Sequence, residues 1–363
     1  MPGARSAGRG AMPRSASLVV QTSFLGDTVL TTPLLAELAR RGAVDVVVTP
    51  AAAPLLANHP AIRERFVYDK RGADAGAMGL WRLARRIRCH YQARGERATA
   101  YLAQGSARSA ALALLAGCGD RVGFGTSPGR LLYTQVVPHR ADRHHAERLW
   151  RLAFPNDPGV EPSASAITPH LYPGDAERVA VSALLGDAPD DRPIVALAPG
   201  SVWGTKRWPY YPELAARLAP AARLVVVGGA ADSAIAGEIA AAVPDARVVD
   251  ATGRLSLLAS AELIARAALL VTNDSSPQHL ASAVGTPTIT IFGPTVPEFG
   301  FGPLAPGSVV VQHETLPCRP CHHHGPPTCP LGHWKCMREL GVERVATAAA
   351  ELLNRPPGVP ADR

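Results

Sequence analysis

Four polar side chains stand where an apolar run ends, and their types suit the binding of an anion: Asp274, Ser275, Ser276 and His279. The run over residues 267–271 predicts a buried strand, and Pro277 suits the first turn of a helix with Ser276 as its N-cap. The free N–H groups and the dipole of a helix N-terminus attract a phosphate. The segment therefore predicts a phosphate site, and an ordinary capped turn is the alternative.

A Gly-rich loop with basic side chains follows the apolar run Ile194–Ala198 and is a second candidate site. Ser201, Lys206 and Arg207 could offer a hydroxyl group and positive charge to a pyrophosphate. The spacing of a P-loop is absent, and so is any Asp-x-Asp pair that could bridge a metal ion to a sugar nucleotide. We therefore expect the charge of a leaving diphosphate to be met by Lys206, Arg207 and the helix start at Ser276.

A lone carboxylate, Asp27, follows the first apolar run, Leu18–Gln21, at a position where a general base could sit. An N-cap aspartate is the common alternative. If a helix began at Asp27, Pro33 would lie inside it and would cost about 3 kcal/mol. If Thr32 instead caps a helix in which Pro33 is the first residue, Asp27 is free for function.

Three further features carry weaker signals. Asp232 follows a strand that ends in glycines, so it could bind a ribose hydroxyl or simply cap a helix. His144 and His145 begin a helix that could line a cleft, although a surface position is the default. Another helical face could attract an anionic lipid or could simply be solvated, and it consists of Trp81, Arg82, Arg85, Arg86 and Arg88.

Four of the six cysteines are clustered: Cys318, Cys321, Cys329 and Cys336. Such spacing in a cytosolic chain favours a metal site over disulfides, so we predict a structural zinc site here. A reduced cysteine-rich loop is the alternative. The pattern leaves no open coordination position, so we do not expect this site to be catalytic.

Strands and helices alternate along the chain in two series that are separated by an unpatterned stretch over residues 154–173. This alternation predicts two α/β domains with parallel sheets, and a ligand cleft between them. The expected divisions are a disordered extension (1–16), an N-terminal domain (17–170), a C-terminal nucleotide-binding domain (171–341) with the cysteine-rich segment (318–336), and a last helix and tail (342–363).

The 363-residue chain has a net charge of +7, which suits an anionic partner without identifying one. No run of about 18 apolar residues predicts a transmembrane helix, and the Arg-rich start is not a secretion signal. We therefore expect a cytoplasmic protein that docks on the inner membrane face, with no nucleic-acid partner.

The chain resembles the bacterial lipopolysaccharide heptosyltransferases, glycosyltransferase family nine, from Leu18 to about Leu353. Four blocks carry the resemblance: Phe24–Pro33, Gly105–Ala110 with His144–Arg148, Pro199–Pro209, and Asn273–Pro294. The cysteine-rich segment is most similar to the heptosyltransferase II branch. The resemblance implies a GT-B fold, in which two Rossmann-like domains face a central cleft. It also implies inverting, metal-independent transfer from ADP-L-glycero-D-manno-heptose onto the first heptose of the lipid-linked inner core.

The resemblance also implies roles for individual residues. Asp27 matches the position of the general base, and Lys206 matches a diphosphate-binding lysine with Ser201 beside it. The turn formed by Asp274, Ser275, Ser276 and His279 matches the donor site, and Asp232 matches an acid near the nucleoside. The acceptor side is expected to include Arg108, His144 and His145.

Two other classes of function remain open. One is a different GT-B enzyme with another nucleotide sugar, such as an epimerase, and the other is a non-catalytic nucleotide-sugar-binding protein. A nicotinamide dehydrogenase is not supported, because no G-x-G-x-x-G follows the first strand.

Overall fold

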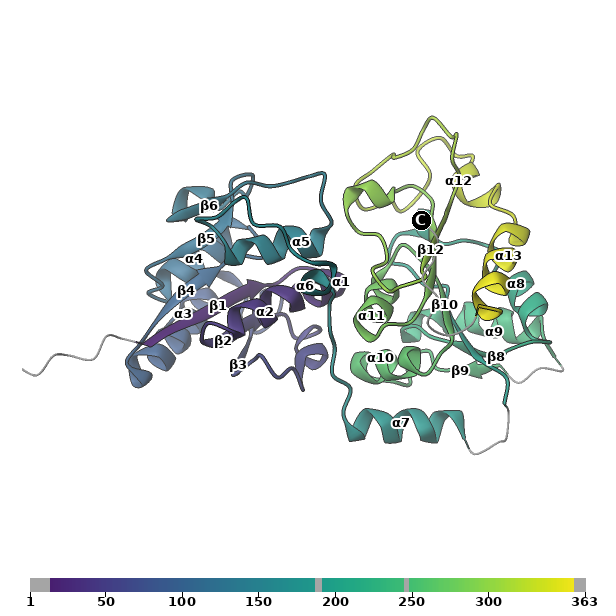
Figure 1. The fold of residues 1–363 in the computed structure, drawn as a ribbon, viewed down its shortest axis with the longest axis horizontal. Helices are drawn as coiled ribbons and strands as arrows, with labels where there is room; N and C mark the ends of the chain where they lie inside the picture. The colour runs from purple at the N-terminus through teal and green to yellow at the C-terminus, as the bar shows by residue number, and fades with distance from the viewer. Residues whose placement is uncertain (1–13, 187–190, 245–247, 356–363) are drawn as a thin grey trace, which may run out of the picture.

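The computed structural model describes residues 14–186, 191–244 and 248–355, and it places them in two α/β domains that lie side by side (Figure 1). The strands of the first domain are β1 (Arg14–Gln21), β2 (Ala43–Val48), β3 (Glu64–Val67), β4 (Glu96–Tyr101), β5 (Arg121–Phe124) and β6 (Gln135–Val137). Those of the second domain are β7 (Ile194–Ala198), β8 (Arg223–Val226), β9 (Val249–Asp250), β10 (Leu269–Asn273), β11 (Thr288–Phe292) and β12 (Val309–Gln312).

Each domain contains one six-stranded parallel sheet. The strand order is β3-β2-β1-β4-β5-β6 in the first sheet and β12-β11-β10-β7-β8-β9 in the second. In both sheets the order reverses beside the first strand, and ligands of open α/β sheets bind at such a reversal, outside the carboxyl ends of the strands. β10 and β11 are buried throughout, as expected for parallel strands that are covered on both faces.

Helices cover both faces of each sheet. Those of the first domain are α1 (Leu25–Leu30), α2 (Thr32–Ala39), η1 (Ala53–Leu56), α3 (Gly76–Arg94), α4 (Ala107–Leu115), η2 (Arg130–Leu132), α5 (His145–Trp150), η3 (Arg151–Ala153) and α6 (Ala164–Ile167). The second domain has α7 (Asp175–Leu185), η4 (Gly204–Lys206), α8 (Tyr211–Leu218), η5 (Ala230–Asp232), α9 (Ser233–Ala241), α10 (Leu257–Ala265), α11 (Ser276–Val284), η6 (Pro297–Phe299), α12 (Lys335–Arg338) and α13 (Val342–Leu353).

Several predicted boundaries are confirmed and others move. β1 begins at Arg14, inside the extension predicted to be disordered over residues 1–16, of which residues 1–13 lie outside the described part of the chain. The predicted strand Ile194–Ala198 is β7, whereas the run over residues 267–271 becomes β10 two residues later, at Leu269–Asn273. The stretch over residues 154–173, which has no apolar periodicity, includes the short helix α6. α13 packs against α8 and against β10, β11 and β12, so it belongs to the second domain.

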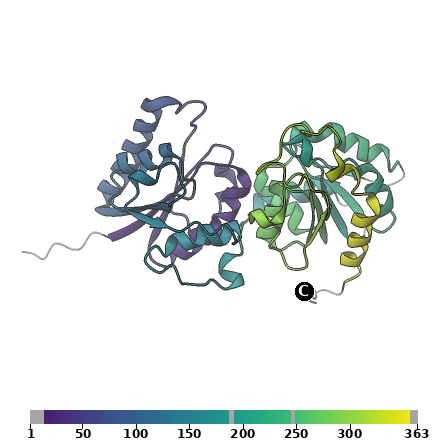
Figure 2. The same cartoon turned by 90° about the horizontal axis from the view of Figure 1, so that it is seen from above.

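The two domains meet through α1 and α11, and the view from above shows the same contact (Figure 2). An apolar cluster continues across this contact and includes Leu30 from the first domain and Ala281 from the second. A second contact joins α5 to the segment after η6, because the backbone N–H of His145 donates to the Gly300 carbonyl at 2.7 Å. Arg148 Nη2 donates to the Phe299 carbonyl at 2.7 Å. Among the described helices, none is both long and apolar enough to cross a membrane.

Candidate functional site

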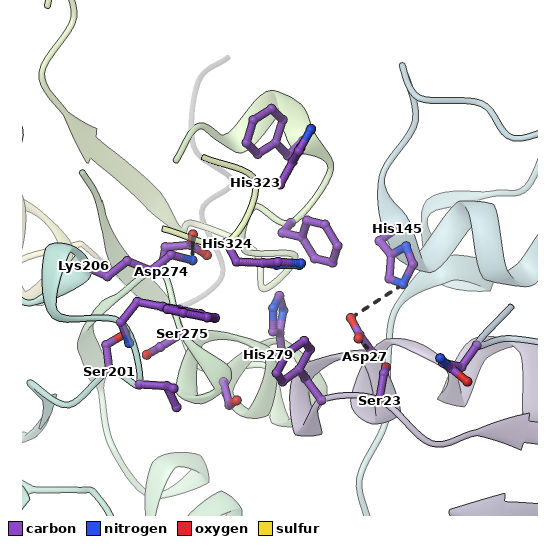
Figure 3. Close-up of a pocket in the computed structure, with 18 of the residues that line it drawn as sticks. Ser23, Asp27, His145, Ser201, Lys206, Asp274, Ser275, His279, His323 and His324 are labelled. Atoms are coloured by element: carbon purple, nitrogen blue, oxygen red, sulfur yellow. Dashed lines mark hydrogen bonds and ion pairs between the residues drawn. The ribbon is translucent and has the colours of Figure 1, made fainter. Parts of the chain in front are cut away.

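A cavity of about 420 Å³ lies between the domains, and both domains line it (Figure 3). α1 and α5 contribute from the first domain, and η4, α11 and the segment around η6 contribute from the second. The predicted site residues that line it are Asp27, His145, Ser201, Lys206, Asp274, Ser275, Ser276 and His279. The fold therefore brings the lone carboxylate and the phosphate-type turn, which lie far apart in the chain, to one cavity.

Asp27 lies in the first turn of α1 and does not cap it. The N-cap residue is Phe24, and no side chain caps this helix. α1 ends at Leu30 and α2 begins at Thr32, so the chain breaks beside Pro33 as predicted. The predicted cap is wrong by one residue, because Thr31 is the N-cap and Pro33 is the second helical residue. The Asp27 carboxylate is therefore available for other contacts, as the sequence predicted.

Two side chains hold the Asp27 carboxylate. Ser23 Oγ donates to its Oδ2 at 2.5 Å, and His145 Nε2 lies 3.7 Å from its Oδ1 (Figure 3). The Asp27 side chain keeps 19% of its exposure, so its carboxylate remains open to the cavity. A hydroxyl group of a ligand could reach it there.

The two imidazoles nearest Asp27 are neutral at neutral pH. Burial, followed by the charge of Arg148, lowers the pKa of His145 from 6.5 to about 3. Burial also lowers the pKa of His279 from 6.5 to about 4. The contact between His145 and Asp27 is therefore polar rather than ionic, and Asp27 has no cationic partner among these rings.

Lys206 and Asp274 form a buried ion pair on the opposite side of the cavity. Lys206 Nζ lies 2.5 Å from Asp274 Oδ2, and the two side chains keep 10% and 9% of their exposure. Thr295 Oγ1 donates to the same oxygen at 2.6 Å, and Gln278 Nε2 donates to Asp274 Oδ1 at 2.9 Å. These bonds hold Lys206 beside the turn between β10 and α11, where the sequence predicted a phosphate site.

The N-terminus of α11 opens on the cavity without a side-chain cap. The predicted cap, Ser276, is the first helical residue, and Ser275 occupies the N-cap position. The Ser275 hydroxyl donates instead to the carbonyl of Asn273 at 3.3 Å. The prediction of Ser276 as the cap is thus wrong by one residue, because Pro277 occupies the second helical position rather than the first, which the first turn of a helix also tolerates. In the described part of the chain the Ser276 N–H has no hydrogen-bond partner and could bind an anion, whereas Pro277 has no N–H and the Gln278 N–H donates to the Ser275 carbonyl at 3.2 Å.

A second cavity of about 440 Å³ adjoins the first, and Ser201, Ser275 and Ser276 line both. Asp232 lines the second cavity, and its Oδ2 accepts the Gly229 N–H at 2.9 Å. A Cβ atom on Gly200 would lie 2.4 Å from Asp232 Oδ1, so only glycine allows this approach. The Asp232 carboxylate therefore lies against the Gly-rich loops that end β7 and β8.

The predicted acceptor-side residues separate. His145 lines the first cavity, whereas His144 caps α5, because its Nδ1 accepts the Ala146 N–H at 3.1 Å. His144 Nε2 lies 3.0 Å from the Gly302 carbonyl, so the ring also links the two domains. Arg108 is exposed near the start of α4 and lines neither of these cavities. The roles of these residues toward an acceptor stay predictions.

The structure does not support the predicted zinc site at Cys318, Cys321, Cys329 and Cys336. Within residues 14–186, 191–244 and 248–355, no group of three or more His, Cys, Asp or Glu side chains is placed to hold a metal ion. Cys336 packs into the apolar core of the second domain, and Cys321 is exposed. Cys318 Sγ instead lies 3.8 Å from His333 Nε2. Spacing along the chain did not reveal these different surroundings.

Two residues of the site, Ser23 and Thr295, were not predicted, and His324 was not predicted to line the cavity. Ser23 lies four residues before Asp27, and Thr295 follows the end of β11 beside β10, so their positions at strand ends were an available signal. His324 lines the cavity from the cysteine-rich segment. Its partners lie far away in the sequence, so no local pattern identifies it.

Comparison with known proteins gives consistent matches. The family described as glycosyltransferase family 9 (heptosyltransferase) matches residues 81–334. Lipooligosaccharide heptosyltransferase 2 of Haemophilus influenzae is 29% identical over 81% of this chain and 88% of its own length. Lipopolysaccharide heptosyltransferase 1 of Pseudomonas aeruginosa is 31% identical over 93% of this chain and 98% of its own.

A solved structure extends this similarity to three dimensions. The Escherichia coli ADP-heptose lps heptosyltransferase II superposes with a TM-score of 0.73 at 26% identity, covering 93% of this chain and 98% of that chain. The two parallel sheets and their helices match that architecture, so the predicted GT-B fold is confirmed.

Proposed function

Because this chain belongs to glycosyltransferase family 9, the heptosyltransferase family, we propose that it transfers heptose from ADP-L-glycero-D-manno-heptose to the lipopolysaccharide inner core. The acceptor we propose is the first heptose of that core. The observation that carries the proposal is that Asp27 faces the Lys206–Asp274 pair across one cavity (Figure 3). A base from one domain and an anion site from the other are the two parts that a direct displacement needs.

Asp27 acts as the general base in this proposal. Its carboxylate takes the proton of the acceptor hydroxyl while that oxygen attacks the anomeric carbon of the heptose. The bond from the anomeric carbon to the diphosphate breaks on the opposite face, so ADP leaves and the configuration inverts. Ser23 and the neutral ring of His145 orient the carboxylate without adding a positive charge beside it.

The second domain binds the donor in this proposal. The diphosphate contacts Lys206, Ser201 and the N-terminus of α11. These groups stabilise its charge as the bond to the anomeric carbon breaks. The nucleoside occupies the adjoining cavity, where Asp232 lies near the ribose. These protein groups meet the charge of the leaving group, so the transfer does not require a metal ion.

The acceptor is lipid-linked, so we also propose that the enzyme works at the cytoplasmic face of the inner membrane and meets it through α3. This helix of 19 residues has five arginines and no acidic residue. Met78 is 64% exposed and Trp81 is 49% exposed on its outer side. The Arg85 guanidinium lies 5.7 Å from the centre of the Trp81 ring. Exposed apolar and basic side chains on one helix suit an anionic lipid surface.

The decisive experiment measures ADP release from ADP-heptose with two acceptors, a core with one heptose and a core with none, and also without an acceptor. We expect ADP release and a mass gain of one heptose only with the first acceptor. Equal activity on the core without heptose would contradict the proposed acceptor. A change of the nucleotide sugar without any acceptor would indicate an epimerase, and tight ADP binding without turnover would indicate a binding protein.

A further inference from the structure

A loop of the cysteine-rich segment covers the phosphate side of the cavity. His323 and His324 line the cavity, although no lining residue outside this pair is near them in the sequence (Figure 3). His323 lies against Phe299, with ring centroids 5.0 Å apart. The loop is therefore part of the cavity wall.

The loop is fixed on the basic loop that carries Lys206. Gly325 has φ +86°, and a Cβ atom there would lie 3.2 Å from Lys206 Cε. Thr205 Oγ1 donates to the Pro326 carbonyl at 2.5 Å. Lys206 and Thr205 thus contact Gly325 and Pro326, the two residues that follow His324. These contacts determine where the imidazole of His324 lies.

His324 stands between aromatic side chains of the two domains. Its ring is stacked on Trp203 with centroids 6.3 Å apart and an angle of 11° between the planes. Phe24 of the first domain lies 5.7 Å away on centroids. Figure 3 shows the ring in the middle of the cavity, between Lys206 and Asp27. An imidazole held there faces the space between Lys206, the cation proposed to contact the leaving group, and Asp27, the proposed base.

The charges around His324 leave room for a further hydrogen-bond donor to the diphosphate. Among the described residues that line this cavity, Lys206 is the one Lys or Arg, and it is already paired with Asp274. Arg207, which the sequence also predicted to meet the diphosphate charge, lines the adjoining cavity instead. Burial, followed by the charges of Lys206 and His322, lowers the pKa of His324, whereas Asp27 raises it and His323 lowers it. The imidazole offers an N–H donor whether or not it gains a proton.

We propose that His324 donates a hydrogen bond to the diphosphate of the donor, at the phosphate that carries the sugar. This inference rests on the proposed function, because it takes the ligand to be an ADP-sugar. His324 then joins Lys206 and the N-terminus of α11 around the leaving group. The cysteine-rich segment therefore contributes a donor-binding residue as well as a wall of the cavity.

The test compares ADP with AMP, since only ADP has the second phosphate. Calorimetry would measure both affinities for the wild-type protein and for His324→Gln, His324→Phe and His322→Gln. The Phe variant retains an aromatic ring beside Trp203 and removes the N–H. His322 lies in the same loop and its Nδ1 accepts the backbone N–H of His324 at 3.0 Å, a bond that the side-chain oxygen of Gln can also accept. Because His322 does not line the cavity, His322→Gln is the matched control.

We expect His324→Phe to bind ADP about tenfold more weakly and AMP almost unchanged, as for one hydrogen bond to a charged group, whereas His324→Gln keeps a side-chain N–H donor and should bind ADP more tightly than His324→Phe. His322→Gln should bind both nucleotides like the wild type. Equal weakening for ADP and AMP, or unchanged ADP binding, would overturn the inference, and so would an absence of ADP binding to the wild type. If ADP binding depends on His324 but no heptose is transferred, the inference stands and the proposed function fails.

Discussion

The imidazole of His279 occupies the space that a side chain at Gly26 would need. A Cβ atom on Gly26 would lie 2.6 Å from His279 Cδ2. Gly26 belongs to α1 and His279 to α11, so this contact joins the two domains at the wall of the cavity. The distance between Asp27 and the donor side of the cavity depends on it.

Gly26→Ala should push the two domains apart. We expect a loss of about 1–3 kcal/mol of stability from overpacking, and at least a tenfold loss of kcat/KM because Asp27 moves from the donor. Thermal unfolding and steady-state kinetics would measure the two effects. Gly237→Ala in α9 is the control, because nothing lies within 4 Å of its Cβ position. Equal effects at both positions would contradict the argument.

Asp27→Asn should retain ADP affinity and lower the rate of transfer by about 10²–10⁴-fold, the usual contribution of a general base. The amide has nearly the same shape but cannot take a proton at neutral pH. Calorimetry with ADP and single-turnover kinetics separate binding from chemistry. Weaker ADP binding together with an unchanged single-turnover rate would show that Asp27 is a binding residue.

Lys206→Met should weaken ADP binding strongly and destabilise the protein by about 3–5 kcal/mol, because Asp274 would remain buried without its partner. The double variant Lys206→Met with Asp274→Asn should regain much of that stability but not the affinity for ADP. Denaturant unfolding and calorimetry would distinguish the two effects. If the double variant also regains ADP affinity, Lys206 has no direct role in binding.

Acid should destabilise the folded protein through its buried histidines. The pKa of His279 falls from 6.5 to about 4 on folding, so between these pH values the unfolded chain binds a proton that the folded chain does not. The contribution of neutral His279 to stability is therefore complete above about pH 6.5 and is lost as the pH falls toward 4.

Between these pH values, the free energy of unfolding changes by about 1.4 kcal/mol per pH unit for each histidine whose pKa is lowered on folding. His279→Gln should flatten the dependence of the unfolding free energy on pH by about that amount between pH 6.5 and 4. Denaturant unfolding at several pH values would measure it. An unchanged slope in the variant would show that His279 is not the group that titrates.

The outer face of α3 should bind anionic membranes. Trp81→Ala combined with Arg85→Glu should abolish co-sedimentation with vesicles of phosphatidylglycerol and phosphatidylcholine, and leave transfer to a soluble acceptor fragment unchanged. Arg40→Glu is the control, because Arg40 is 79% exposed at the C-cap of α2, in the same domain. Equal loss with the control would indicate a general effect of charge rather than binding by α3.

Patterns of neighbouring residues in the sequence predict the local features of this protein. β7 lies where its apolar run predicts, and Pro33 separates α1 from α2, because a proline ring fits only the first turn of a helix. The polar turn after β10 and the lone Asp27 were also identifiable, since strand ends and helix starts are encoded by neighbouring residues. Short strands such as β3 and β6 were missed, because few residues carry their pattern.

Which of these features come together depends on the packing of the two domains. The pairing of Lys206 with Asp274, the approach of His279 to Gly26 and the insertion of His324 into the cavity join segments that are distant in sequence. The same packing buries Cys336 in an apolar core, where cysteine spacing alone predicted a metal ligand. A sequence pattern reports the preferences of adjacent residues, whereas contacts between distant side chains depend on how the two sheets and their helices bury their apolar faces.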